Sequence, residues 1–135
     1  MRQVGNYPLW IGTSRDARDM RFLLSQGIHA LIDLAAEEWP VQPNRELVYL
    51  RFPIVDGGGN EPKLLRSLMA AATALIRERV PTLIACRMGM SRSPTVAAVA
   101  YGSVYGLTPP EVMKLMDGPA DVSTVLLREL ESVMA

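Results

Sequence analysis

Hydrophobic and polar positions along the chain divide it into short apolar runs and longer amphipathic segments. The short runs are rich in Leu, Ile and Val, which is typical of strands. We expect strands near residues 9–12, 28–34, 47–52 and 81–85. Segments with helical periodicity separate and follow these runs. The order of elements therefore predicts an α/β fold whose central sheet is twisted, mostly parallel and flanked by helices.

Capping residues, prolines and glycines set the expected bounds of the helices. The expected helices are 15–26, capped by Ser14 and ended by Gly27; a long amphipathic helix after Pro62; a tightly packed helix from Pro94; a short helix from the capping box at Thr108 to about Met116; and a last helix from near Asp121. His29 is expected to be a packed residue of its strand. The Leu and Met stripe of the last helix is expected to lie in the core. The larger aromatic side chains are expected to be core or loop anchors: Trp10, Phe22 and Trp39.

Composition predicts one folded domain spanning residues 1–135. A hydrophobic content of 49% is enough for one core, and 14 basic and 14 acidic residues give a net charge of zero. There is no basic excess for nucleic acid, no apolar run of membrane-spanning length and no signal-peptide pattern at the start. We therefore expect a cytoplasmic monomer that binds neither nucleic acid nor membranes. The single cysteine excludes an internal disulfide.

That cysteine, Cys86, lies at the end of an apolar run and precedes Arg92 by six residues. A short loop between a strand and a helix presents its backbone amides and the helix N-terminus to one point, which favours an anion. The same groups stabilise a thiolate. The pattern predicts a phosphate-binding loop with a nucleophile at its floor; the alternative is a buried structural cysteine beside a surface arginine.

The loop resembles the signature His-Cys-x5-Arg-Ser/Thr of the cysteine-dependent protein tyrosine phosphatases, and specifically of the small dual-specificity phosphatases. The matching residues are Cys86, Gly89, Ser91, Arg92 and Ser93. The resemblance continues upstream through residues 9–35 and downstream through the following helices, so it covers nearly the whole chain. Low-molecular-weight phosphatases share a similar string but carry it at the N-terminus, which argues against them here.

The resemblance implies a role for each loop residue. Cys86 would be the nucleophile that forms a phosphocysteine intermediate, and Ser93 would hydrogen-bond its sulfur as it leaves phosphorus. Arg92 would bind two phosphoryl oxygens through its planar guanidinium. The expected phosphate-binding residues are Arg87, Met88, Gly89, Met90, Ser91 and Arg92. No metal or other cofactor is implied.

Phosphoester cleavage at neutral pH also needs a group that protonates the leaving oxygen. Asp56 lies thirty residues before Cys86, after a strand-like run and before three glycines, which is the order that the family uses for its general acid. The alternative is an aspartate that merely forms a turn. Asn60 matches the family's second polar position, and it is equally suited to cap the helix that begins near Pro62.

Two departures from the family pattern stand out. Ala85 occupies the position of the usual histidine, which makes this an atypical member and predicts weaker stabilisation of the thiolate. Residues 119–123 read Pro-Ala-Asp-Val-Ser where relatives often have Pro-Asn-x-Gly-Phe, so support of the loop from that side is open. Met88 and Met90 are apolar where inositol-phosphate phosphatases often carry basic residues; they favour aromatic phosphoesters or simply pack on neighbouring loops.

The sequence thus predicts a hydrolase whose partner is a phosphorylated protein. The expected substrates are phosphotyrosine monoesters; a broader specificity would add phosphoserine and phosphothreonine monoesters. Two alternatives remain open. One is a phosphate-binding adaptor that has lost catalytic efficiency. The other is a phosphatase of a non-protein substrate such as an inositol phosphate or an RNA 5'-phosphate; both of these would favour a more basic rim.

Overall fold

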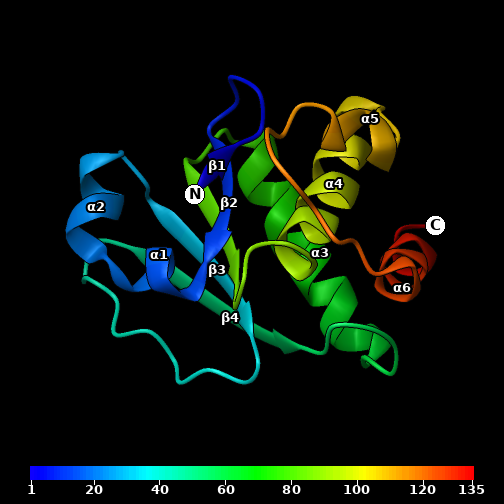
Figure 1. Cartoon of the computed structure of the whole chain (residues 1–135), viewed down its shortest axis with the longest axis horizontal. Coiled ribbons are helices and arrows are strands. Elements are labelled where there is room, and N and C mark those ends of the chain that lie inside the picture. Colours follow the sequence, from blue (N-terminus) through cyan, green and yellow to red (C-terminus); the bar gives the residue numbers. More distant parts are fainter.

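A five-stranded sheet forms the centre of the computed structural model, which describes residues 1–135 (Figure 1). Its strands are β1 (Arg2–Gln3), β2 (Leu9–Thr13), β3 (Ala30–Ala35), β4 (Val48–Ile54) and β5 (Thr82–Cys86). They lie in the order β1-β2-β5-β3-β4, and only the β1–β2 pair is antiparallel. The predicted α/β fold with a mostly parallel sheet is confirmed. Strand β1 was not predicted, because two residues carry no periodicity.

Helices cover both faces of the sheet. On one face lie α1 (Ser14–Arg18) and α2 (Met20–Ser25); on the other lie α3 (Pro62–Arg77), α4 (Arg92–Tyr105), α5 (Pro109–Met113) and α6 (Thr124–Met134) (Figure 1). Because successive side chains of a strand point to opposite faces of the sheet, β5 contributes to the hydrophobic clusters on both faces. Leu83 and Ala85 join the smaller hydrophobic cluster on the α1–α2 side, whereas Ile84 and Cys86 join the larger one under α3 and α4. None of the six helices combines the length and the hydropathy that a transmembrane span requires.

The predicted helix over 15–26 is wrong in one respect: it is two helices. Asp19 ends α1 and, with a φ of −88° and ψ of 78°, caps α2 by accepting a hydrogen bond from Phe22 N–H. The cap of α1 is also one residue earlier than expected. Thr13 forms a capping box with Asp16, while Ser14 is the first helical residue and its buried hydroxyl has no hydrogen-bond partner.

Other boundaries and burial predictions differ locally. His29 is exposed and precedes β3, so its prediction as a packed strand residue is wrong; only its backbone bonds, with Pro81 and Val48, join the sheet. Trp39 is 85% exposed and does not anchor the core. The capping box at Thr108 is confirmed, but α5 ends at Met113, and α6 begins at Thr124 with Ser123 as its cap.

A buried carboxylate, Asp33, links β3 to β4. Asp33 is 3% exposed and lies opposite Arg51 in the strand register. It accepts hydrogen bonds from Tyr49 Oη at 2.6 Å, from Arg51 Nη1 at 3.2 Å and from Ala35 N–H at 3.1 Å. Arg51 Nη2 continues to the carbonyl of Glu38 at 2.8 Å. Asp33 therefore fixes the turn that follows β3 as well as the strand pair.

We predict that Asp33→Asn lowers the free energy of unfolding by about 2 kcal/mol, because it removes the charge of a nearly buried pair and places an amide donor among donors. Urea unfolding followed by circular dichroism measures this loss. Glu46→Gln is the matched control, since Glu46 is exposed and its carboxylate has no recorded partner. An unchanged urea midpoint for Asp33→Asn would contradict the prediction.

Candidate active site

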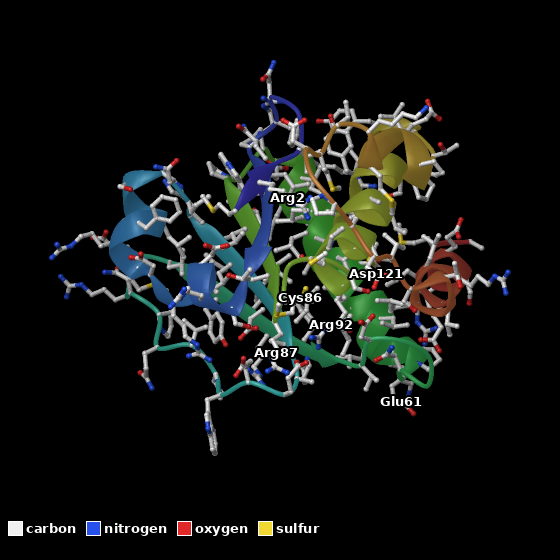
Figure 2. The ribbon with its side chains drawn as sticks, viewed as in Figure 1. Arg2, Glu61, Cys86, Arg87, Arg92 and Asp121 are labelled. Carbon is white, nitrogen blue, oxygen red and sulfur yellow. The ribbon has the colours of Figure 1, made fainter.

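The carboxyl ends of the four parallel strands meet at one edge of the sheet. Ligands of open α/β sheets bind outside this edge, because loops from neighbouring strands converge there. The residues that follow β3, β4 and β5 include Glu37, Asp56 and the loop Cys86–Arg92. Together they line a cavity of about 330 Å³. Figure 2 shows Cys86, Arg87 and Arg92 at this edge, with Asp121 reaching it from the segment before α6.

The loop between Cys86 and Arg92 turns its carbonyl groups outward. Ser14 N–H donates to the carbonyl of Arg87 at 3.3 Å, Arg2 Nη2 donates to that of Gly89 at 3.0 Å, and Asp121 N–H donates to that of Met90 at 2.6 Å. In a trans peptide unit the following N–H points the opposite way, and the chain has no cis peptide. The amides of Met88, Met90 and Ser91 thus face the inner side. None of them donates a hydrogen bond within the protein, so they form a cradle for an anion.

Gly89 makes this tight loop possible. Its φ of +69° lies in the left-handed region, and a Cβ there would sit 3.0 Å from the backbone carbonyl atoms of Gly12. Both constraints exclude a side chain at this position. The glycine therefore lets the loop press against the end of β2, where Ser14 N–H and Arg2 reach its carbonyls.

The sulfur of Cys86 lies at the floor of the cradle. Cys86 is 2% exposed, yet it is among the residues that line the cavity. Ser93 contacts the sulfur twice: its N–H donates to Sγ at 3.4 Å and its Oγ lies 3.4 Å from Sγ. A hydroxyl and an amide at this position stabilise negative charge on sulfur. Ala85, the residue before it, is fully buried on the opposite face and offers the loop no side-chain donor.

Arg92 is 6% exposed and begins α4. Its Nη1 donates to the carbonyl of Leu34 at 3.3 Å and to that of Ile54 at 3.2 Å. These residues lie at the carboxyl ends of β3 and β4. Glu37 accepts from Nη1 at 2.9 Å and from Nη2 at 2.8 Å, in a bidentate pair. The Nε–H and the second Nη2–H donate to no group of the protein. That edge of the guanidinium is therefore free to bind two oxygens of an anion.

The pair of Arg92 and Glu37 sets the charge of both groups. Burial alone would lower the pKa of Arg92, but the hydrogen bonds and charge of Glu37 raise it above its usual value. Hydrogen bonds from Arg92 outweigh burial and lower the pKa of Glu37. Both groups are therefore ionised at neutral pH. Sequence reasoning missed Glu37, although its place two residues after β3 is a signal that could have found it.

Asp56 lies at the mouth of the cavity, two residues after β4. Ser91 Oγ donates to Asp56 Oδ1 at 2.8 Å, which holds the carboxylate against the Cys86–Arg92 loop. Asn60 does not cap α3: the cap is Glu61, which makes no side-chain bond. Its amide instead closes the loop by bonding both the N–H and the carbonyl of Val55, at 2.7 and 3.0 Å. The interpretation of Asn60 as a helix cap is therefore wrong.

The remaining predicted residues lie at the rim. Arg87 is exposed, with its Nε 3.9 Å from Glu38 Oε1. Met88 is 66% exposed and Met90 36%, and both line the cavity rather than being covered by neighbouring loops. Asp121 is a cavity residue that the sequence did not reveal, and its carboxylate has no hydrogen-bond or ion-pair partner. All predicted site residues except Gly89 and Ser93 line this one cavity; these two support the loop and the sulfur.

No protein-family model and no curated protein matches the chain in sequence. Solved structures match it closely in fold. Human DUSP28 has a TM-score of 0.81 at 21% identity, over 98% of this chain and 94% of that one. A mouse putative dual specificity phosphatase complexed with zinc tungstate has a TM-score of 0.80 at 22% identity, over 98% and 84%. The human tyrosine phosphatase-like serine/threonine/tyrosine-interacting protein has a TM-score of 0.78 at 16% identity, over 99% and 95%. The chain thus has the fold of the dual-specificity phosphatases.

We predict a pH-dependent contribution of Glu37 to stability. Its folded pKa is lowered from 4.5, so the contribution is present above pH 4.5 and is lost as the pH falls through the folded value. The urea midpoint of Glu37→Gln should be below that of the unmodified protein at pH 7, and the gap should close towards pH 3. Glu38→Gln is the matched control, because Glu38 makes only the loose pair with Arg87. A gap that is constant with pH would contradict the prediction.

We also predict that Asp121→Asn strengthens anion binding, because an unpaired carboxylate in the cavity wall repels an oxyanion. Titration calorimetry with tungstate should give a Kd lower by about threefold at low ionic strength, and the gain should fade in ~1 M salt, where the Debye length is about 3 Å. Asp117→Asn, an exposed carboxylate four residues earlier and outside the cavity, should leave the Kd unchanged. Equal Kd values of Asp121→Asn and the unmodified protein for tungstate would contradict the predicted repulsion by Asp121.

Proposed function

We propose that this chain is a cysteine-dependent phosphoric monoester hydrolase that acts on phosphotyrosine, and also on phosphoserine or phosphothreonine, in proteins. One observation carries the proposal: the sulfur of Cys86, the unbonded loop amides, the free edge of Arg92 and the carboxyl of Asp56 all face one cavity. These are the groups that a phosphoryl transfer to sulfur requires. The dual-specificity phosphatase fold supports the same reaction class.

In the first step the Cys86 thiolate attacks phosphorus in line with the leaving oxygen. The new S–P bond forms as the P–O ester bond breaks, and the electron pair of that bond goes to the leaving oxygen. Asp56, protonated at this stage, gives that oxygen its proton. The loop amides and Arg92 bind the equatorial oxygens, where charge spreads in the transition state. The products of this step are the free hydroxyl compound and phosphocysteine.

In the second step Asp56, now a carboxylate, takes a proton from water as the water oxygen attacks phosphorus. The S–P bond breaks and its electron pair returns to sulfur. Ser93 stabilises the resulting thiolate through its N–H and hydroxyl. Ser91 Oγ donates to Asp56 Oδ1 in the free protein, and the same hydrogen bond holds the carboxylate against the loop when water attacks.

The rim supports protein monoesters over polyphosphorylated substrates. Met88 and Met90 present apolar surface beside the cavity, which suits the ring of phosphotyrosine. The unpaired carboxylate of Asp121 repels a second phosphate group. Arg87, the one cation of the rim, already faces Glu38. A single phosphate attached to a flat apolar group fits these surroundings better than an inositol polyphosphate.

We predict that hydrolysis of para-nitrophenyl phosphate between pH 5 and 8 depends on Cys86 and Asp56. Cys86→Ser should lower kcat by at least about 10³-fold, because the nucleophile is lost. Asp56→Asn should lower kcat by about 10²-fold for phenyl phosphate, whose leaving group needs a proton, and less for the nitrophenyl ester. Asp117→Asn is the matched control and should keep full activity.

Turnover that persists in Cys86→Ser would exclude the proposed mechanism. Absence of turnover in the unmodified protein, with vanadate still bound, would instead identify a phosphate-binding adaptor. Inorganic phosphate release from phosphotyrosine and phosphoserine peptides, measured on the same preparations, separates the two substrate classes.

A further inference from the structure

The loop that carries Asp56 is closed internally by one amide side chain. Asn60 Oδ1 accepts from Val55 N–H at 2.7 Å, and Asn60 Nδ2 donates to the carbonyls of Val55 at 3.0 Å and Gly57 at 3.3 Å. These bonds join the two ends of the Asp56–Gly59 turn. They fix its shape, but they do not place it relative to the phosphate-binding loop.

Helix α6 supplies that placement. Glu129 Oε2 accepts from Gly59 N–H at 2.9 Å, and Glu129 Oε1 accepts from Asn60 Nδ2 at 3.1 Å. The loop also presses on the helix, since a Cβ at Gly58 would lie 3.0 Å from Val125 Cγ1. Figure 2 shows Glu61, at the end of the loop, just below α6. One carboxylate thus uses both of its oxygens to hold a segment that is 69 and 70 residues away in sequence.

The helix that presents Glu129 is itself firmly seated. Leu126 and Leu130 are fully buried in the larger hydrophobic cluster, whereas Val125 and Glu129 face the loop that carries Asp56. The segment that leads into α6 also contacts the phosphate-binding loop, through Asp121 N–H and the Met90 carbonyl at 2.6 Å. Residues 121–129 therefore touch both loops of the active site.

We propose that Glu129 is a positioning residue for the general acid: it anchors the Asp56 loop on α6 and so holds the Asp56 carboxyl at the leaving oxygen. The inference rests on the proposed phosphatase function. A glycine-rich turn has many accessible conformations, and proton transfer needs the carboxyl within hydrogen-bond reach of the leaving oxygen. A misplacement of about 1 Å can cost up to ~10²-fold in rate. Two hydrogen bonds to a fixed helix restrict the turn to the productive position.

The test compares Glu129→Ala and Glu129→Gln on two substrates that differ in leaving group. Phenyl phosphate needs protonation of its leaving oxygen, whereas para-nitrophenolate departs as a stable anion. Glu129→Ala should lower kcat for phenyl phosphate by about tenfold and for para-nitrophenyl phosphate by less than about twofold. Glu129→Gln, which keeps one acceptor oxygen, should fall between. Glu131→Ala, an exposed carboxylate on the same helix, should behave as the unmodified protein.

A double-mutant cycle separates positioning from general damage. In the Asp56→Asn background, Glu129→Ala should cause no further loss, because the group that it positions is gone. The inhibition constant of vanadate should stay unchanged in both Glu129 variants, since the cradle and Arg92 are intact. Thermal unfolding shows whether Glu129→Ala is folded. If it is not, the two substrates are compared with Glu129→Gln instead.

Equal losses on both substrates, additive losses in the double mutant, or no loss at all would each overturn the positioning role. These outcomes differ from failure of the proposed function itself, which would appear as turnover that is absent in the unmodified protein or independent of Cys86.

Discussion

Burial of the Arg92 guanidinium is the constraint on which the site depends. Burying a charged group that is 6% exposed costs several kcal/mol unless hydrogen bonds and an opposite charge compensate for the lost water. The acceptors are the carbonyls of Leu34 and Ile54 and the carboxylate of Glu37, so the first residue of α4 is tied to the ends of β3 and β4. Cys86 ends β5, which lies beside β3. Both ends of the Cys86–Arg92 loop are therefore fixed to the sheet, which restricts the path that the loop can take between them.

The ion pair of Arg92 and Glu37 also determines which groups attract an anion to the cavity. Glu37 neutralises much of the charge of Arg92, so the cradle does not act as a bare cation. The inward amides and the free edge of the guanidinium provide directed hydrogen bonds instead, which bind oxygens in a fixed geometry. Asp56 and Asp121 add negative charge at the mouth.

The sequence predicted the features that depend on neighbouring residues. It missed the contacts between residues that are far apart in the sequence. Strand positions, the sheet type and the motif from Cys86 to Ser93 follow from apolar runs and spacing within a few residues. The break at Asp19 was missed because a capping side chain competes with the helical periodicity of its neighbours. Glu129 was missed for another reason: its partners, Gly59 and Asn60, lie 70 and 69 residues away, and a single acidic residue on a helix surface gives no signal of such a contact. For Glu37, whose partner Arg92 lies 55 residues away, the only local signal was its place just after β3.

The two departures from the family pattern have different physical consequences. At residues 119–123 the Cys86–Arg92 loop is supported by a backbone donor, Asp121 N–H, which any residue but proline provides. The changed side chains there leave this support in place. At Ala85 the consequence is a missing group, because a buried methyl in the apolar cluster gives the loop no hydrogen bond. The hydrogen bonds to the Cys86 sulfur therefore come from Ser93 alone, through its N–H and its hydroxyl, each at 3.4 Å.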